Sequence, residues 1–484
     1  MCHGSKPRCM GIGNAVGVTI AAPGYPCDLL NGYPEPRGWD EAVAANGTAR
    51  HASRSALDAL AAHDLETLAT DIRERMAEAE VAFQSDEGDA AFLVDPVPRV
   101  LAADEWAGLE AGLAQRVRAL DAFVADAYGA QDIVTQGVVP RRVLESANHY
   151  EPALRGIRPA GRHWITVAGL DVVRDPNGRF LVLEDNLRTP SGFAYAVAAR
   201  TAVADALRPG ERPRSLDPLP GLLGAALRSA APEGVEEPRI AVLSDGPTNS
   251  AWWEHRWAGR ALDVEVLTPD DVTVRDDALV TVADGRRIDV VYRRSDADTL
   301  ATDVGQLLLK PMLAGTLGVA NAFGTGVADD KLMHAYVEDM VRFYLGEEPL
   351  VPSVETFDLA SSTTLERVLD TFENLVLKPR GGYGGIGVLI GPRASRAEIE
   401  RTRHAVRAAP ESWIAQRPVF LSTHPTVIDG RLQPRHVDLR PFIFLTDGEA
   451  HVLPGGLTRV AFDAGALVVN SSQNGGAKDT WVAR

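Results

Sequence analysis

Residues 163–192 read HWITVAGLDVVRDPNGRFLVLEDNLRTPSG, and the rest of the chain is arranged around this stretch. Two apolar, β-branched runs flank the tetrapeptide DPNG at positions 175–178. Turn-forming residues between two strand-like segments are typical of a tight hairpin. If residues 175 and 178 pair at the turn, Asp171 lies opposite Val182. The stretch therefore predicts a hairpin with a defined register.

The strands of this hairpin carry hard oxygen donors. Side chains alternate between the two faces of a strand, so Asp171, Glu184 and Asn186 are expected on one face. Two carboxylates and an amide carbonyl suit Mg²⁺ or Mn²⁺, which keeps water and substrate phosphates in its other positions. The alternative is a solvated strand end, because acidic strand ends are common. This face is a candidate metal site.

Composition and charge narrow the class of protein. A chain of 484 residues has room for two or three domains of roughly 150 residues. The net charge of −17 argues against nonspecific binding to nucleic acid or to an anionic membrane, so a polyphosphate site needs a local group of Lys and Arg. Cys2, Cys9 and Cys27 form no CxxC pair, and no apolar run approaches the ~18 residues of a membrane span. These features favour a cytoplasmic protein.

Helical periodicity marks three segments on either side of the hairpin. Residues 52–83 are dense in Ala, Leu, Glu and Arg and predict an amphipathic helix pair. Residues 103–128 carry one apolar stripe and predict a long helix, to which we assign core packing only. A further helix is expected over residues 193–207, and the proline-rich passage at 208–221 predicts a surface connection.

From residue 239 the pattern changes to strand, helix and strand. The strand RIAVLSD leads through residues 246–249 into a helix over 251–262, and DVEVL follows as a second strand. Open α/β sheets bind ligands at the carboxyl ends of such strands. A hairpin is then expected around residues 284–285, ending on Arg293 and Arg294. These arginines are either a solvated pair or ligand-binding groups at the end of a buried strand.

Two lysines precede or follow glycine-rich loops. The loop 324–330 leads to Lys331 at the expected start of a helix, where a cation opposes the helix dipole unless an anion binds there. Lys378 ends a strand that runs into GGYGGIG at 381–387, where backbone N–H groups could approach phosphate oxygens. The chain continues as a strand rather than a helix, so the glycines predict a hairpin rather than a dinucleotide-binding turn. The chain contains no Gly-Lys dipeptide, which excludes a Walker A loop.

The last part of the chain is predicted to be strands. The strand beginning at Trp413 is interrupted at residues 416–418, where Pro418 removes a backbone donor and indicates a hinge or sheet edge. In PRHVDLRPFIF at 434–444, Arg440 precedes a buried run. An arginine at such a position can clamp phosphate or carboxylate with two hydrogen bonds.

Together these parts resemble an ATP-grasp nucleotide site. In the usual order the lysines and the glycine loop precede the metal-binding pair, whereas here the pair comes first. This order resembles the circularly permuted ATP-grasp (type 2) proteins related to glutathionylspermidine synthetase, and the motifs occur over residues 55–484. They read LVLEDNLRTPSG, GTGVADDK, LKPRGGYGG, RHVDLRPF, PGGLTRV and NSSQNGGAKDTW.

The resemblance implies a mixed α/β (α+β) protein with a circularly permuted ATP-grasp fold. It implies an N-terminal helical segment and a Rossmann-like pre-ATP-grasp subdomain. The expected divisions are a poorly docked tail at 1–40, a helical segment at 41–140, the metal-binding part at 141–215, the pre-ATP-grasp-like subdomain at 216–325, and the lysine, glycine-loop and hinge part at 326–484.

The resemblance also implies roles for single residues. Asp171, Glu184 and Asn186 would hold Mg²⁺, with Mn²⁺ as the alternative ion. The arginines expected to clamp the carboxylate or the transferred phosphoryl group are Arg188, Arg293, Arg294 and Arg440. The residues expected to bind ATP are Lys331, Lys378, Gly381, Gly382, Tyr383, Gly384, Gly385, Gln416, Arg417 and Val419.

The activity implied is that of an ATP-dependent carboxylate–amine ligase. A carboxylate would attack the γ-phosphate of ATP, and an amine would capture the resulting acyl phosphate as an amide. The expected substrates are a small carboxylate and an amine or peptide, and the resemblance allows a protein partner from the same pathway. Two alternatives stay open: a phosphotransferase that stops at the phosphorylated substrate, and an ATP-binding scaffold or sensor without chemistry.

Overall fold

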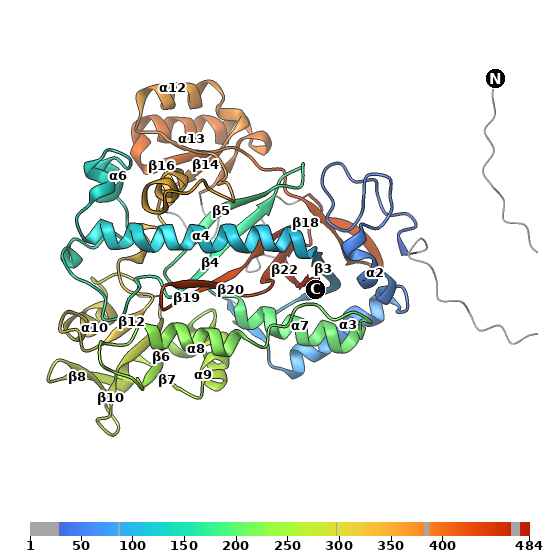
Figure 1. The fold of residues 1–484 in the computed structure, drawn as a ribbon. Coiled ribbons are helices and arrows are strands. Elements are labelled where there is room, and N and C mark those ends of the chain that lie inside the picture. The colour runs from blue at the N-terminus through green and yellow to red at the C-terminus, as the bar shows by residue number, and fades with distance from the viewer. Residues whose placement is uncertain (1–28, 86–87, 297, 382–386, 466–474) are drawn as a thin grey trace, which may run out of the picture.

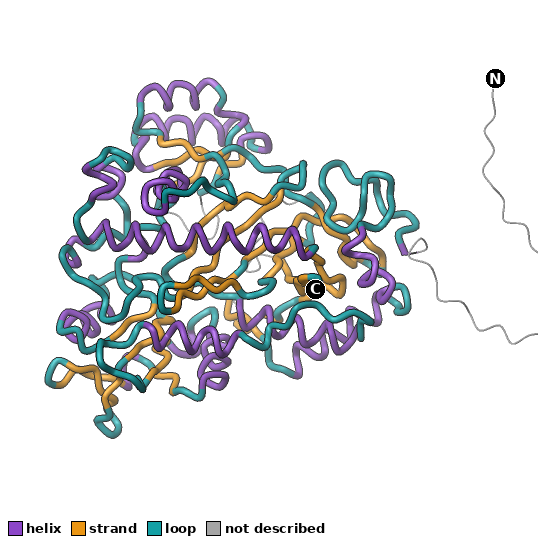
Figure 2. The backbone as a smooth tube through the Cα atoms, in the orientation of Figure 1, coloured by secondary structure: helices purple, strands orange, loops and turns teal. Residues whose placement is uncertain are grey.

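The computed structural model describes residues 29–85, 88–296, 298–381, 387–465 and 475–484. It is a mixed α/β protein in which one long helix lies across a large central sheet (Figure 1). A small lobe with α12 and α13 stands on one side of that sheet, and a parallel sheet with its helices lies on the other (Figures 1 and 2). Among the helices of the described ranges, none combines the length and apolar character needed to cross a membrane.

The central sheet has nine strands. Seven of them follow the order β20-β19-β4-β18-β21-β22-β3, while β5 pairs with β4 and β17 pairs with β18. Strands β22 and β3 are parallel, and the other pairs are antiparallel. The bounds are β3 (Val94–Leu101), β4 (Val167–Arg174), β5 (Phe180–Asn186), β17 (Thr423–Ile428), β18 (Arg431–Arg440), β19 (Phe442–Thr446), β20 (Glu449–Val452), β21 (Leu457–Ala461) and β22 (Gly475–Val482).

The predicted hairpin is β4–β5, but its register differs from the expectation. Asp171 pairs with Glu184 rather than with Val182, which pairs with Val172. The register shifts by one residue between these two pairs, so the strand β5 carries a bulge that sequence spacing does not reveal. Asn186 pairs with Gly169, and directly opposed antiparallel residues share a face. Asp171, Glu184 and Asn186 therefore still belong to one face.

Helices cover both faces of the central sheet. Helix α4 (Ala103–Tyr128) has the predicted bounds and packs with Ile443 and Leu445 of β19 in one core. Helix α7 (Phe193–Leu207), also as predicted, shares the second core with Phe442 and Phe444. The alternation along β19 thus separates the two cores. The second core also includes α2 (Arg54–Leu60), α3 (Leu65–Glu78) and α8 (Leu219–Ser229).

The predicted strand–helix–strand unit is part of a parallel sheet of order β12-β11-β6-β7. Its elements are β6 (Ile240–Ser244), α9 (Trp252–Leu262), β7 (Glu265–Leu267), β11 (Val290–Arg294), α10 (Asp303–Leu313) and β12 (Gly318–Ala320). Beside it lies a small sheet of β8 (Val272–Arg275), β9 (Ala278–Thr281) and β10 (Arg287–Ile288), which contains the predicted hairpin around residues 284–285. Arg293 and Arg294 end β11 next to the carboxyl end of β6.

The small lobe holds the strand that ends in Lys378. Its antiparallel sheet has the order β13-β16-β14-β15, with its own core against α12 and α13. Val376 and Leu377 pair with Ile390 and Leu389, so the chain returns as a hairpin, as predicted. The bounds are β13 (Thr356–Asp358), α12 (Ser362–Asp370), β14 (Val376–Pro379), β15 (Leu389–Ile390), α13 (Arg396–Ala408) and β16 (Trp413–Gln416).

The segment before the first helix is docked against the central sheet. Asp40 is fully buried, accepts a hydrogen bond from Tyr33 at 2.7 Å and forms a bridge with Thr423 of β17. Residues 33–40, which the sequence assigned to a poorly docked tail, are therefore part of the folded body. Residues 1–28, with the three cysteines, lie outside the described residues. Shorter elements are β1 (Ala82–Ser85), β2 (Gly88–Ala91), α5 (Asp132–Thr135), α6 (Arg141–Glu145) and α11 (Val337–Met340).

Candidate functional site

Glu184 of β5 and Lys378 of β14 face each other across the junction between the central sheet and the small lobe. Lys378 Nζ lies 3.3 Å from Glu184 Oε1. The lysine side chain is 11% exposed and the glutamate side chain is 36% exposed, so the pair is open to a ligand from the glutamate side. The structure thus brings one predicted metal ligand and one predicted phosphate ligand into direct contact.

Lys331 belongs to the same neighbourhood, although not at the start of a helix. It lies in a turn ahead of the 3₁₀ turn η6 (Met333–Tyr336), and the α-helix α11 begins only at Val337. The helix-dipole argument for Lys331 is therefore wrong. Burial lowers the pKa of Lys331, the carboxylate of Glu184 opposes this shift and the ammonium of Lys378 adds to it. Lys331 and Lys378 thus both act electrostatically with the carboxylate of Glu184.

Asp171 meets two arginines on the metal-site face of the hairpin. Arg440 donates to both carboxylate oxygens at 2.7 and 3.0 Å, and Arg459 of β21 approaches Oδ2 at 3.0 Å. Arg459 also pairs with Asp438, which is 3% exposed. Burial by itself would raise the pKa of Asp171, but the two guanidinium groups hold it well below its usual range. Asp171 is therefore a carboxylate at neutral pH.

Arg188 follows the hairpin and enters a second charged cluster. Its Nε lies 2.9 Å from Asp329, and its guanidinium also contacts Asp298 and the ring of His149 at 2.9 Å. The cluster is partly open, because the side chains of Arg188 and Asp298 are 31% and 26% exposed. Gly326 approaches it so closely that a Cβ there would lie 2.8 Å from Arg188 Cδ. The loop that carries Lys331 is thus pressed against Arg188.

Arg293 lies beneath this cluster and is 1% exposed. Its guanidinium sits 4.8 Å from the centroid of the Phe323 ring. Burial lowers the pKa of Arg293 to about 10, while Asp298 acts in the opposite direction. Arg293 therefore remains cationic at neutral pH and adds positive charge behind the partly open cluster.

Arg294 contacts the loop that follows Arg188. It donates to the carbonyl of Pro190 at 2.9 Å and to the hydroxyl of Ser191, and it pairs with Glu254 at 3.3 Å. Glu254 in turn accepts the backbone N–H of Gly192 at 2.9 Å, at the start of α7. These contacts shape the loop between the hairpin and α7, so the structure gives Arg294 a loop-holding position.

Behind the metal-site face, Asp185 points to the opposite side of β5. Arg116 of α4 binds both its oxygens at 2.6 and 2.8 Å, and His334 Nδ1 lies 2.8 Å from Oδ2. His334 is in the 3₁₀ turn that follows Lys331. This buried cluster joins α4, the hairpin and the Lys331 loop at one point.

The glycine loop and the hinge are only partly described. Gly382, Tyr383, Gly384 and Gly385 lie outside the described residues, and Gly381 faces Asn148.

The hinge residues have separate surroundings. Gln416 is buried and donates to Thr356 at 2.9 Å, while Val419 packs beside the hairpin core. Arg417 is exposed and pairs with Glu355 at 2.5 Å, away from the Glu184–Lys378 pair in the contacts of the described chain.

The donor set is compatible with a divalent cation. Asn186 Nδ2 is buried without a hydrogen-bond partner in the described part of the chain. A carboxylate offers about four lone-pair positions, and the contacts above take three on Asp171, which leaves one on Oδ1. Within the described ranges, no group of three or more His, Cys, Asp or Glu side chains could hold a metal ion. The proposed set has two carboxylates and the amide of Asn186. The three residues keep their predicted role as a proposal.

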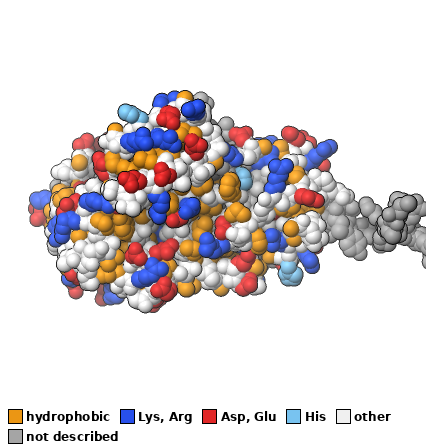
Figure 3. Space-filling view, turned by 90° about the horizontal axis from the view of Figure 1, so that it is seen from above, with side chains coloured by type: hydrophobic (Ala, Val, Ile, Leu, Met, Phe, Trp, Pro, Cys, Tyr) orange, Lys and Arg blue, Asp and Glu red, His pale blue; other side chains and the backbone are white. Residues whose placement is uncertain are grey.

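Sequence reasoning missed several charged partners of the site. Arg459, Asp329 and Arg116 do not stand out by spacing, although the first two lie inside the motifs PGGLTRV and GTGVADDK. The position of Arg459 beside Asp171 depends on the pairing of β18 with β21 and β4, segments far apart in the chain. Arg116 and Asp329 meet the hairpin from α4 and from the loop before Lys331. On the face of the molecule above α12 and α13, basic and acidic side chains are interspersed (Figure 3).

Comparisons with known proteins give one family and a fold. A family model described as circularly permuted ATP-grasp type 2 matches residues 98–461. A Frankia alni protein named "Putative glutamate--cysteine ligase 2-3" is 42% identical over 500 residues, covering 98% of this chain and 57% of that protein. A Mycobacterium tuberculosis protein is 41% identical over 462 residues, covering 92% of this chain and 84% of that protein. This chain therefore spans little more than half of the Frankia relative.

A solved structure shares the fold. A glutathione synthetase-like effector from Globodera pallida, in its apo form, superposes with a TM-score of 0.59. The match covers 87% of this chain and 97% of that chain at 11% sequence identity. This chain and that effector therefore share their overall fold.

Proposed function

Because the chain belongs to the circularly permuted ATP-grasp type 2 family, we propose that it is an ATP-dependent carboxylate–amine ligase acting through an acyl phosphate. The observation that carries this proposal is the contact between Glu184 and Lys378, with Lys331 beside them. A carboxylate with two lysines acting near it suits a metal-bound polyphosphate, because the lysines neutralise phosphate oxygens while the carboxylate binds the metal ion.

In the proposed site Asp171, Glu184 and Asn186 hold Mg²⁺. The ion would neutralise charge on the β- and γ-phosphates of ATP. Lys331 and Lys378 bind phosphate oxygens, and Lys378 leaves Glu184 for the nucleotide. Residues 416–419 and Gly381 are also assigned to the nucleotide, together with residues 382–385, which lie outside the described residues.

The substrate carboxylate is placed in the proposal at the partly open Arg188 cluster. Arg188 is the exposed member, Arg293 supplies buried positive charge behind it, and Arg440 faces the metal-site carboxylate. A carboxylate oxygen attacks the γ-phosphorus, and ADP leaves. The amine nitrogen then attacks the acyl carbon, loses its proton, and phosphate leaves as the amide forms. Cationic charge and exclusion of water are the main contributions of the protein to such a reaction.

The test is Mg²⁺-dependent ADP release by the purified protein. The reaction is run with and without pooled amino acids, short peptides and polyamines, with glutamate plus cysteine as a separate pair because the Frankia relative is named for them. Release that requires both a carboxylate and an amine, with an amide product in mass spectrometry, supports the ligase. Phosphorylated product without amide indicates a phosphotransferase. Nucleotide binding without release under any pool contradicts both enzymes and favours a scaffold.

A further inference from the structure

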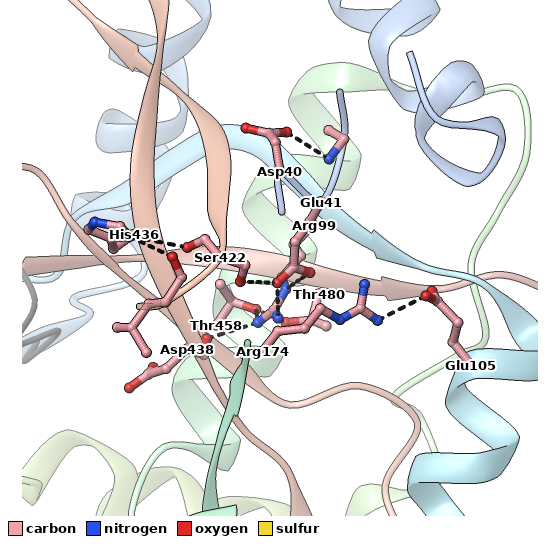
Figure 4. A network of polar contacts seen from close by, with 12 residues as sticks. Asp40, Glu41, Arg99, Glu105, Arg174, Ser422, His436, Asp438, Thr458 and Thr480 are labelled. Carbon is pink, nitrogen blue, oxygen red and sulfur yellow. Dashed lines mark hydrogen bonds and ion pairs between the residues drawn. The ribbon is translucent and has the colours of Figure 1, made fainter. Parts of the chain in front are cut away.

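A buried ion pair ties the N-terminal segment to the central sheet. Glu41 receives hydrogen bonds from Arg99 of β3 at 2.6 and 2.7 Å, and the two side chains are 1% and 0% exposed. Ser422 donates to the same carboxylate at 2.5 Å (Figure 4). Glu41 precedes the residues matched by the family model, which begin at residue 98. A charge so placed is costly to bury unless it is paired.

The Glu41–Arg99 pair is connected to Asp171 on the metal-site face of the β4–β5 hairpin. Arg99 NH1 donates to the carbonyl of Asp438 at 3.0 Å, and Figure 4 shows both residues in one network. The carboxylate of Asp438 holds Arg459 at 2.5 and 2.8 Å, and Arg459 contacts Asp171 at 3.0 Å. An unbroken series of polar contacts thus runs from Glu41 to Asp171.

A second contact reaches the tip of the same hairpin. The ring of Trp39 lies against the turn so closely that a Cβ on Gly178 would be 2.7 Å from it. Arg174, at the end of β4, stacks over Phe180 at 4.0 Å and pairs with Glu105 of α4 at 3.0 Å. The N-terminal segment therefore contacts the hairpin at its turn and, through Arg99, near its metal-site face.

We propose that residues 39–41 and Arg99 form a positioning element that fixes Asp171 for the metal ion of the ligase reaction. The inference rests on the proposed function, since it assigns Asp171 to the metal. Neither Glu41 nor Arg99 touches the nucleotide. They act on Asp171 through Asp438 and Arg459. If Arg99 shifts, the carbonyl of Asp438 loses its hydrogen bond, and Arg459, which the Asp438 carboxylate holds against Asp171, shifts with Asp438. Residues that orient a metal ligand from behind change metal affinity by roughly ten- to a hundredfold when replaced.

A purely structural role would look different, and the chain offers a matched control. Lys478 of β22 and Asp95 of β3 form another ion pair, with side chains 0% and 1% exposed. Its further contacts go to the carbonyl groups of Val97 and Pro425 and to the N–H of Val427, and not to Asp171. Cutting this pair disturbs the same sheet, while the hydrogen bonds and ion pairs of the series that ends at Asp171 involve neither Lys478 nor Asp95.

The experiment compares the double variants E41Q/R99M and D95N/K478M with wild type, all as the full chain. Both remove a buried charge pair together, which avoids leaving an unpaired charge that could prevent folding. Single E41Q and Glu41→Asp are added, the latter as a conservative rescue. Circular dichroism and thermal unfolding report the fold. Binding of Mn²⁺ in the presence of ADP is measured by electron paramagnetic resonance, ADP affinity without metal by calorimetry, and turnover as ADP release against Mg²⁺.

We expect E41Q/R99M to bind Mn²⁺ at least roughly tenfold more weakly, to need correspondingly more Mg²⁺ for half-maximal ADP release, and to keep its metal-free ADP affinity within about twofold. Glu41→Asp should bind Mn²⁺ more tightly than single E41Q. D95N/K478M should match wild type in Mn²⁺ binding. Equal Mn²⁺ affinity in E41Q/R99M and wild type, or equal losses in both double variants, overturns the positioning role. Wild-type protein that binds Mn²⁺ in the presence of ADP, yet produces no ADP from ATP with any substrate pool, would contradict the ligase proposal. In that case the comparison of Mn²⁺ affinities still decides this inference.

Discussion

Lys378 Nζ lies 3.3 Å from Glu184 Oε1, although 194 residues separate the two in the chain. The contact joins a strand of the small lobe to a strand of the central sheet. It is the point at which the two parts of the proposed nucleotide site meet. Four predictions test this site and the structure that supports it.

Replacing Glu184 by Gln should leave the fold intact and reduce Mg²⁺-dependent ADP release by roughly a hundredfold or more, the scale for loss of a preorganised charge. The side chain is partly exposed, so its removal disturbs little packing. Glu400→Gln is the control, because Glu400 is an exposed helix residue paired with Arg403. Release by Glu184→Gln near the wild-type rate would remove Glu184 from the metal site.

Replacing Lys378 by Met should weaken ADP binding before it affects anything else. A hydrogen bond to a charged group contributes about 1.5–3 kcal/mol, so calorimetry should show a dissociation constant roughly ten- to a hundredfold higher. Lys310→Met removes an exposed lysine that pairs with Asp277 and should bind ADP as wild type does. Unchanged affinity in Lys378→Met would place the phosphates elsewhere.

Replacing Arg116 by Met should lower the free energy of unfolding by about 3–5 kcal/mol, because Asp185 would remain buried without its guanidinium partner. Urea unfolding measures the change. Arg118, two residues along the same helix, pairs with Glu347 at 3.6 Å, and both side chains are more than 40% exposed. Arg118→Met should therefore cost less than about 1 kcal/mol. Equal losses in the two variants would show that the Asp185 cluster adds no special stability.

His255 should make the stability depend on pH. Its ring is 2% exposed and its Nδ1 lies 2.7 Å from the Ser244 hydroxyl, and burial lowers its pKa from 6.5 to about 2. Since the unfolded ring takes up a proton near pH 6.5, this contribution is fully present above that pH and is lost as pH falls toward about 2.

Between pH 7 and pH 5 wild type should therefore lose about 2 kcal/mol more unfolding free energy than His255→Gln. Urea unfolding of both proteins at the two pH values measures this difference. Parallel losses in the two proteins would mean that folding does not lower the pKa of His255.

Local pattern predicted most of the elements. Helix α4 has the predicted bounds because its apolar stripe and flanking residues agree over the whole segment. The turn at 175–178 and the strand–helix–strand unit from residue 239 depend on equally local signals. The predicted register of the hairpin was wrong. Beside the turn it is shifted by one residue, since Arg174 pairs with Phe180, and the bulge between Asp171 and Val172 adds a second residue, so Asp171 lies opposite Glu184. A bulge cannot be read from the turn residues.

Lys331 shows where local pattern fails. The apolar spacing after it favours a helix, but the structure has turns and 3₁₀ geometry until Val337. Here Asp330 is held by Arg380 at 2.8 Å and His334 by Asp185 at 2.8 Å. Such long-range polar contacts outweigh a helix preference worth a fraction of a kcal/mol per residue.

The sequence by itself determined the composition of the site: two carboxylates and an amide on one hairpin face, two lysines, and arginines at the ends of buried strands. Alternation along a strand is a local property, so it can be read without the fold. Only the tertiary structure decided which charges meet. It pairs Lys378 with Glu184, Asp171 with Arg440 and Arg459, and Glu41 with Arg99. The Asp171 pairings depend on strand order in the central sheet. The other two depend on how the small lobe and the N-terminal segment lie against that sheet, and all three join segments far apart in the chain.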